Sequence, residues 1–364
     1  MTLLTDVHDD HGAAFGTRGG REVVTDYGRP ERSHRAVRNA SGVIEYAADI
    51  LSVTGEDRLE FVDNAVSNTV PEADGHGVYA LLLTPQGRIR TDMYIFNAGE
   101  RLLVFLPPGN GDAVADDWGE KTFIQDVEVE LVTDQFAYFG VHGPKATEKI
   151  ASVISAETPR EPLTFVRGSM ADVGVTVIRM DGPAGEEGYH VVAEADDALY
   201  VFDTLVNRGQ NAAPFGYRTW ESLTLEAGTP LFETELDGGV PNNLGLANAV
   251  DYDKGCFVGQ EVVSRVENRG EPTKRLVGLV TEEVSEAGAA VFDGDEHVGE
   301  ITRTAESPLR DVPFALALVD RAVGEKIEVD AALTVRIDGS DVAATAVTLP
   351  FVDGSEQSAR LPQP

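Results

Sequence analysis

The stretch DKGCFVGQEVVSR, residues 253–265, is the most unusual in the chain, and soon after it the sequence pattern changes at Gly270-Glu271-Pro272. From there to Leu349, short apolar runs are separated by Gly, Asp and Pro, with almost no helical period. That pattern is typical of a small β-barrel or sandwich. We therefore place a domain boundary near residue 271, between a region 1–270 and a C-terminal β-barrel domain 271–364.

The region before this boundary mixes strand and helix patterns, which predicts an α+β fold of antiparallel sheets backed by helices. We expect two interleaved halves, with approximate bounds 1–130 and 131–270. A helix over Asp196–Arg208 should bury Leu199, Phe202, Leu205 and Val206 on one face. Residues 1–40 are polar with weak periodicity, so we expect irregular chain packed on a surface. The clearest strands are Val43–Tyr46, Ile50–Val53, Tyr79–Leu83, Ile89–Phe96, Leu102–Leu106, Phe136–Val141 and Val173–Met180.

The charge balance is strongly acidic. The 364 residues carry 62 acidic and 29 basic side chains, only six of them Lys, for a net charge of −33. With 42% hydrophobic residues the chain has enough apolar material for sizeable cores. Because the acids are spread along the whole chain, we interpret them as adaptation to a salt-rich cytoplasm of the haloarchaeal kind, where salt screens self-repulsion. An acidic surface also argues against nucleic-acid binding, which needs a basic face.

Composition and missing motifs exclude several other classes. Cys256 is the only cysteine, so no internal disulfide can form, and the seven His are scattered, so we predict no metal site. No run approaches the length of a membrane span and no leader pattern begins the sequence, so we expect a cytoplasmic protein. The phosphate-binding and nucleophile-elbow motifs GxxxxGK[ST], GxGxxG and GxSxG are absent.

Residues 253–265 place a thiol between glycines and basic side chains. Lys254 and Arg265 would favour the thiolate of Cys256 and make it a better nucleophile or metal ligand. The alternative is a buried cysteine that serves as a small apolar filler, which is common. The residues alone leave both interpretations open.

Two further stretches contain candidate site residues. Glu186 stands at the centre of the Gly-rich loop GPAGEEGY, residues 182–189, and its carboxylate could accept two N–H bonds from a flat heterocycle. An acidic surface turn is the alternative. Asp92 lies in a strand-like run, and if it faces inward it marks a possible site, with Tyr94 on the same face. Alternation does not decide the orientation.

These stretches together resemble a known superfamily. DKGCFVGQEVVSR resembles the K-G-C-[FY]-x-G-Q-E-x-x-x-R signature of the YgfZ family, which binds folate and assists iron–sulfur proteins. The rest resembles the glycine cleavage T proteins, which are tetrahydrofolate-dependent aminomethyltransferases. The likeness to T proteins lies in the stretches HRAVR from residue 34, VTGED from 53, GRIRTD from 87, GPKA from 143, GEEG from 185 and LTLEAG from 223.

The resemblance implies roles for particular residues. Glu186 would hold the pterin ring, Asp92 would lie near the reactive folate nitrogens, and Arg275 would help to bind the anionic folate tail. The chain departs from the T-protein pattern at Thr224, where the family has Arg, and at Thr91, where it has Asp. It also has Glu187 where the family has Asp.

Three functions follow as hypotheses. The first is a tetrahydrofolate-binding factor for assembly or repair of iron–sulfur proteins, with Cys256 as transient ligand or redox group and iron–sulfur client proteins as partners. The alternative is a folate-dependent aminomethyltransferase, in which Asp92 assists attack of the folate amine on a methylene group carried by a lipoyl carrier protein. The third is a scaffold that has kept the fold and lost the ligand.

Overall fold

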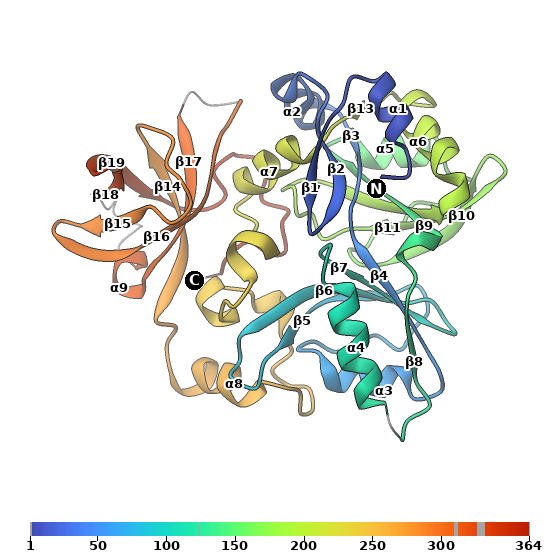
Figure 1. Cartoon of the computed structure of the whole chain (residues 1–364), viewed down its shortest axis with the longest axis horizontal. Helices are drawn as coiled ribbons and strands as arrows, with labels where there is room; N and C mark the ends of the chain where they lie inside the picture. Colours follow the sequence, from blue (N-terminus) through green and yellow to red (C-terminus); the bar gives the residue numbers. More distant parts are fainter. Residues whose placement is uncertain (1, 123, 309–311, 326–331, 364) are drawn as a thin grey trace.

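The computed structural model of the chain describes residues 2–122, 124–308, 312–325 and 332–363. Three sheet-based bodies surround a central helical segment: a five-stranded sheet, a six-stranded sheet and a closed barrel (Figure 1). The predicted α+β class with a C-terminal β-barrel is confirmed. Among the described residues, no helix is long and apolar enough to cross a membrane.

The five-stranded sheet has the order β5-β6-β7-β4-β8 and is antiparallel throughout. One face is covered by α3 (Arg58–Ala65) and α4 (Gly111–Lys121), whose Phe61 and Trp118 meet edge to face in its core. The other face looks toward the middle of the molecule. The strands are β4 (Asp49–Thr54), β5 (Gly77–Leu83), β6 (Ile89–Asn97), β7 (Leu102–Leu106) and β8 (Glu128–Leu131).

The six-stranded sheet has the order β10-β11-β12-β9-β3-β13, and its outer face is covered by α5 (Ala146–Ala151) and α6 (Ala198–Asn207). Strand β3 belongs to this sheet although the next strand, β4, belongs to the other, so the chain crosses between the sheets and returns at β9. The two sheets are therefore interleaved in sequence. The strands are β3 (Gly42–Glu45), β9 (Phe136–His142), β10 (Phe165–Met170), β11 (Val173–Arg179), β12 (Gly188–Glu194) and β13 (Ala213–Pro214).

The barrel closes in the order β14-β17-β16-β15-β18-β19, around a core of small and branched apolar side chains. The helix α7 (Tyr217–Glu226) touches β16 and β17 on one side and α2 (Pro30–Asn39) on the other, so it connects the barrel to the rest (Figure 1). The barrel elements are β14 (Lys274–Thr281), β15 (Ala290–Asp293), β16 (Glu296–Glu306), β17 (Pro313–Asp320), α9 (Arg321–Gly324), β18 (Ala332–Ile337) and β19 (Ser340–Val347).

The middle of the molecule is filled by short turns of helix before the barrel. The π-helical turn η3 (Phe232–Leu236) is followed by the 3-10 turns η4 (Pro241–Leu244) and η5 (Ala247–Ala249), and then by α8 (Gln260–Arg269). Two further 3-10 turns, η1 (Thr133–Gln135) and η2 (Ala195–Asp197), connect elements of the two sheets.

The N-terminal segment differs from the prediction of irregular chain. It forms α1 (Thr5–Asp10), a hairpin of β1 (Ala14–Arg18) and β2 (Arg21–Asp26), and then α2. The periodicity is weak because α2 buries only His34 and Val37 and keeps polar side chains on the rest of its surface. The segment is ordered by tertiary contacts, which a search for apolar repeats does not detect.

The buried face of α6 also differs in one residue. Phe202, Leu205 and Val206 are buried as predicted, but the side chain of Leu199 is 54% exposed and Val201 takes its place in the core. The buried face of α6 is therefore rotated about the helix axis by part of a turn relative to the predicted face.

Candidate functional site

A small cavity of about 140 Å³ lies where the inner faces of the two sheets approach α7 and η3. Strands β6, β7, β9 and β12 each contribute side chains to its wall, and a segment that follows the barrel contributes Arg360. The wall is largely aromatic, with a few polar groups. The lining includes Tyr46, Asp92, Tyr94, Phe105, Tyr138, His190, Tyr217, Trp220, Phe232 and Arg360.

Asp92 faces inward, which resolves the orientation that the sequence left open. Its carboxylate is buried; Oδ2 accepts hydrogen bonds from the Tyr79 hydroxyl at 2.9 Å and from Arg360 Nη1 at 3.2 Å. Its other oxygen, Oδ1, is buried and has no partner. Burial raises the pKa of Asp92, although Arg360 opposes that rise. An unpaired oxygen on a buried carboxylate at a cavity wall is a place for a ligand donor.

Tyr94 lies on the same face of β6 as Asp92 and also lines the cavity. Its hydroxyl donates to Asp181 Oδ1 at 2.6 Å and accepts a hydrogen bond from Arg360 Nη2. Burial raises the pKa of Tyr94 well above its usual value, so its hydroxyl stays protonated. The guanidinium of Arg360 thus pairs directly with Asp92 and is linked to a second buried carboxylate, Asp181, through the Tyr94 hydroxyl.

Arg360 was not predicted from the sequence. It lies on the segment after the barrel, which returns to the two sheets and is held by backbone bonds from Ala359 N to Asp181 O at 2.9 Å and from Gln357 N to Gly185 O at 3.1 Å. The guanidinium stacks over the Tyr79 ring at 4.2 Å from its centroid. No motif surrounds Arg360, and its partners are 268 residues away for Asp92 and 266 for Tyr94, so the sequence holds no local signal for it.

Two buried histidines lie behind the aromatic wall. The Tyr138 hydroxyl is bonded to Nδ1 of His190, and the Tyr46 hydroxyl to Nε2 of His142 at 2.7 Å. Burial lowers the pKa of His142 to about 3, and it lowers the pKa of His190 well below its usual value. Both rings are therefore neutral at physiological pH. Of the two, only His190 lines the cavity within the described part of the chain.

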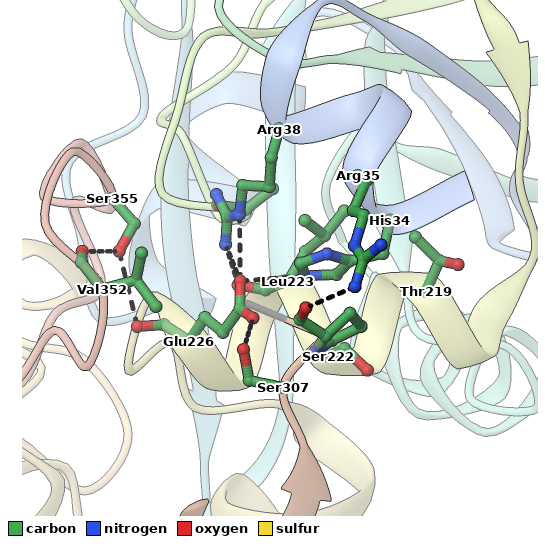
Figure 2. A network of polar contacts seen from close by, with 12 residues as sticks. His34, Arg35, Arg38, Thr219, Ser222, Leu223, Glu226, Ser307, Val352 and Ser355 are labelled. Atoms are coloured by element: carbon green, nitrogen blue, oxygen red, sulfur yellow. Dashed lines mark hydrogen bonds and ion pairs between the residues drawn. The ribbon is translucent and has the colours of Figure 1, made fainter. Parts of the chain in front are cut away.

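Glu186 belongs to a separate buried network outside the cavity lining. Arg38 pairs with Glu186 Oε1 at 2.9 Å and with Glu226 Oε2 at 2.8 Å, and His34 Nε2 lies 3.0 Å from the same Glu226 oxygen. The Ser307 hydroxyl, from the barrel, donates to Glu226 Oε1 at 2.5 Å. Figure 2 shows His34, Arg38 and Ser307 converging on Glu226. The predicted contact between Glu186 and a pterin ring stays a prediction.

The cysteine motif lies near the β5–β6 turn, with some of its side chains exposed and others buried. Cys256 is exposed and is not among the cavity residues. The Lys254 ammonium points away from solvent and donates to the carbonyl oxygens of Asp63, Val66 and Asn68, at 2.7, 3.2 and 2.9 Å. Arg265 pairs with Glu261 one helical turn away on exposed positions. Both basic side chains therefore have partners other than the thiol.

Two other residues of the cysteine motif, Gly259 and Phe257, have structural roles. Gly259 has φ of +83°, and a Cβ there would lie 2.6 Å from the carbonyl oxygen of Thr84, so only glycine fits. Phe257 is buried in the core. Most of the motif thus holds α8 and its loop against the five-stranded sheet.

Arg275 lies on β14, where its side chain packs beside Gly324 of α9. It lines neither the cavity nor the groove described next. Its predicted contact with the folate tail stays a prediction. Among the described residues no group of three or more His, Cys, Asp or Glu could hold a metal ion.

A larger groove of about 720 Å³ runs between α2, α7 and β16, beside the cavity. Both are lined by Arg18, Leu231 and Glu233, so the two spaces adjoin. Arg303 reaches this groove from the barrel and donates to Thr224 Oγ1 at 3.0 Å, so a guanidinium lies against that side chain. Three further arginines line the groove, namely Arg18, Arg35 and Arg218.

Comparison with known proteins agrees with this geometry. The sequence model of the GCVT N-terminal domain matches residues 4–254, and that of the glycine cleavage T-protein C-terminal barrel domain matches residues 274–353. The chain is 30% identical to an aminomethyltransferase of Corynebacterium aurimucosum, over 96% of this chain and 98% of that protein. It is 28% identical to an aminomethyltransferase of Bacillus subtilis, with 96% and 98% covered.

A solved structure has the same fold. The aminomethyltransferase T of the glycine cleavage system from Bartonella henselae superposes with a TM-score of 0.85 at 22% identity, over 98% of each chain. The match runs through both sheets and the barrel. On the two domain matches and the full-length relatives, the chain belongs to the glycine cleavage T-protein family.

Proposed function

We propose that the chain binds a reduced folate in the central cavity and transfers a one-carbon unit to or from it, as an aminomethyltransferase. The observation that carries the proposal is Asp92, whose Oδ1 is buried at the cavity wall without a partner. The curated relatives that match the full length are named aminomethyltransferases, which supports the same conclusion. A lipoyl carrier protein would present the second substrate.

The shape and polarity of the two spaces fit such a ligand. A cavity of about 140 Å³ is smaller than the roughly 300–1,000 Å³ of most ligand pockets, so it would enclose only the ring system. Aromatic side chains suit the faces of a flat heterocycle, and Asp92 Oδ1 suits its N–H groups. The tail would extend into the adjoining groove, where Arg18, Arg35, Arg218 and Arg303 suit its carboxylates.

The residues around Asp92 suit it to hold and move a proton. The folate supplies a ring amine as the nucleophile. Because burial raises the pKa of Asp92, its carboxylate is a better proton acceptor than an exposed one. Tyr79 and Arg360 occupy Oδ2, so Oδ1 is the oxygen left for a ligand donor. The aromatic side chains around the cavity lower the local dielectric constant, which strengthens the interaction of Asp92 with a ligand donor.

The test compares Asp92→Asn with the wild type in two assays. One is calorimetric titration of tetrahydrofolate, and the other is methylene-tetrahydrofolate formation from an aminomethyl-loaded lipoyl carrier. Removing a general base lowers turnover by about 10²–10⁴-fold. We expect that loss in turnover, with affinity changed by less than about tenfold. The control is Asp74→Asn, since Asp74 forms an exposed pair with Arg167 outside the cavity.

Two outcomes would contradict the proposal. If the wild type shows no saturable binding of tetrahydrofolate, the chain is a scaffold that has lost the ligand. If Asp92→Asn keeps full turnover with an active carrier, Asp92 is not the proton acceptor.

The role in iron–sulfur protein assembly is a second candidate, and the exposure of Cys256 is the observation that favours it. An exposed thiol is available to a client protein or to its cluster. Cys256→Ser would then lower the activity of iron–sulfur enzymes in the cell, with folate affinity and stability unchanged. Full activity of those enzymes in the variant would exclude this function.

A further inference from the structure

His190 lines the cavity and, with Asp92 and Arg360, is one of three lining residues that have a buried side-chain atom without a hydrogen-bond partner among the described residues. Its side chain is 5% exposed, and its Nε2 is buried with no partner. The ring is held from three sides, by the Tyr138 hydroxyl on Nδ1 and by the rings of Tyr46 and Tyr138 at 4.8 and 4.9 Å. A buried nitrogen without a partner is costly, unless a ligand supplies the partner.

The hydrogen on the ring can be assigned from its neighbours. The Tyr138 hydroxyl is buried and stays protonated, because burial raises its pKa well above the usual value. A buried O–H needs an acceptor, and the Tyr138 hydroxyl is hydrogen-bonded to Nδ1 of His190. Tyr138 therefore donates, Nδ1 accepts, and the neutral ring carries its hydrogen on Nε2.

The cavity wall thus offers a defined pattern to a ligand. Asp92 Oδ1 accepts, while His190 Nε2–H donates, and the nearby positive charge of Arg360 disfavours protonation of His190. A ring edge that carries an N–H donor and a carbonyl acceptor matches this pattern. A ring edge with an amino group in place of the carbonyl would bring two donors together at His190, which is unfavourable.

We propose that His190 is a specificity-determining residue that donates a hydrogen bond from Nε2 to the 4-oxo group of the ligand ring and so rejects 4-amino analogues. Tyr138 is its positioning residue, because it fixes the tautomer. This inference rests on the proposed folate function and adds to it a named contact that selects between two ligands.

The experiment is a titration of tetrahydrofolate and of its 4-amino analogue into wild type and variants. His190→Phe removes both ring nitrogens and keeps an aromatic side chain. His190→Gln keeps a donor and adds an acceptor on the same amide. The matched control is His142→Phe, since His142 has the same kind of tyrosine partner but does not line the cavity within the described residues.

We expect wild type to bind tetrahydrofolate at least about tenfold more tightly than the analogue, as one hydrogen bond would give. His190→Phe should bring the two affinities within about threefold of each other. His190→Gln should bind tetrahydrofolate within about threefold of wild type. His142→Phe should keep the wild-type preference, even if its melting temperature falls.

The ratio of the two affinities distinguishes ligand recognition from a structural role of His190. Loss of a structural role would lower the affinity for both ligands equally. If wild type binds both equally, or if His190→Phe keeps the preference, the inference is wrong while the folate function stands. If wild type binds neither ligand, the proposed function fails and this inference fails with it.

Discussion

Replacing Lys254 by Met tests whether this residue of the cysteine motif stabilises the fold. The ammonium is only 3% exposed and bonds three carbonyl oxygens at the end of α3, with an ion pair to Asp63 Oδ1 at 3.1 Å. A hydrogen bond to a charged group contributes roughly 1.5–3 kcal/mol, and bonds from one ammonium are not additive. The cost of dehydrating the ammonium offsets part of this. We expect Lys254→Met to lower the free energy of unfolding by about 2–4 kcal/mol.

The assay is urea unfolding in molar KCl, followed by tryptophan fluorescence and circular dichroism. The matched control is Arg265→Ala, which removes the other basic side chain of the motif from an exposed pair and should cost less than about 0.5 kcal/mol. If Lys254→Met costs no more than this control, the reasoning is refuted. In that case the lysine is free to act on the neighbouring thiol.

Three further predictions concern stability. Burial alone would raise the pKa of Glu226, but hydrogen bonds and charge from His34 and Arg38 outweigh it and lower the pKa. The contribution of Glu226 to stability is therefore present above its ordinary pKa of 4.5 and disappears as pH falls below it. Glu226→Gln should therefore lower the free energy of unfolding by about 3 kcal/mol at neutral pH. The variant should also lose less stability than the wild type below pH 4.5, as measured by unfolding across pH. Because the net charge is −33, the melting temperature should rise between about 0.1 and 2 M KCl, and a flat curve would contradict the interpretation of the acidic surface. Gly55→Ala places a Cβ 2.0 Å from the Asp126 carbonyl oxygen at φ of +103°, so it should cost about 2 kcal/mol or more by urea unfolding, unlike Gly119→Ala in open space on α4.

The sequence predicted those parts of the fold where the physical signal is local. Strands such as Tyr79–Leu83 are strongly apolar, because they are buried on both faces, and helices such as α6 show an apolar period. The helix α2 and the N-terminal hairpin were missed, because contacts with α7 and the six-stranded sheet hold them in place. Local propensity does not contain that information.

The candidate site was predicted only in part. Alternation placed Asp92 and Tyr94 on one face of a strand, and both line the cavity, while their roles stay predictions. Arg360 and His190 were not, because each joins the cavity through the packing of separate sheets and no residue type near them in sequence marks the site. Lys254 was assigned to the thiol because it is close in sequence, whereas its partners lie 186–191 residues away.

The pairing of Arg360 with Asp92 also affects the order in which parts of the chain can fold. During synthesis Arg360 emerges from the ribosome after every strand of both sheets and of the barrel. Until then the buried carboxylates of Asp92 and Asp181 have no guanidinium beside them, and their mutual repulsion disfavours burying both. The sheets can form early. The cavity closes only after the barrel has packed against the sheets and the segment that contains Arg360 has returned to them. A ligand that needs the closed cavity would therefore bind only a chain whose C-terminal segment has been synthesised and has packed against the two sheets.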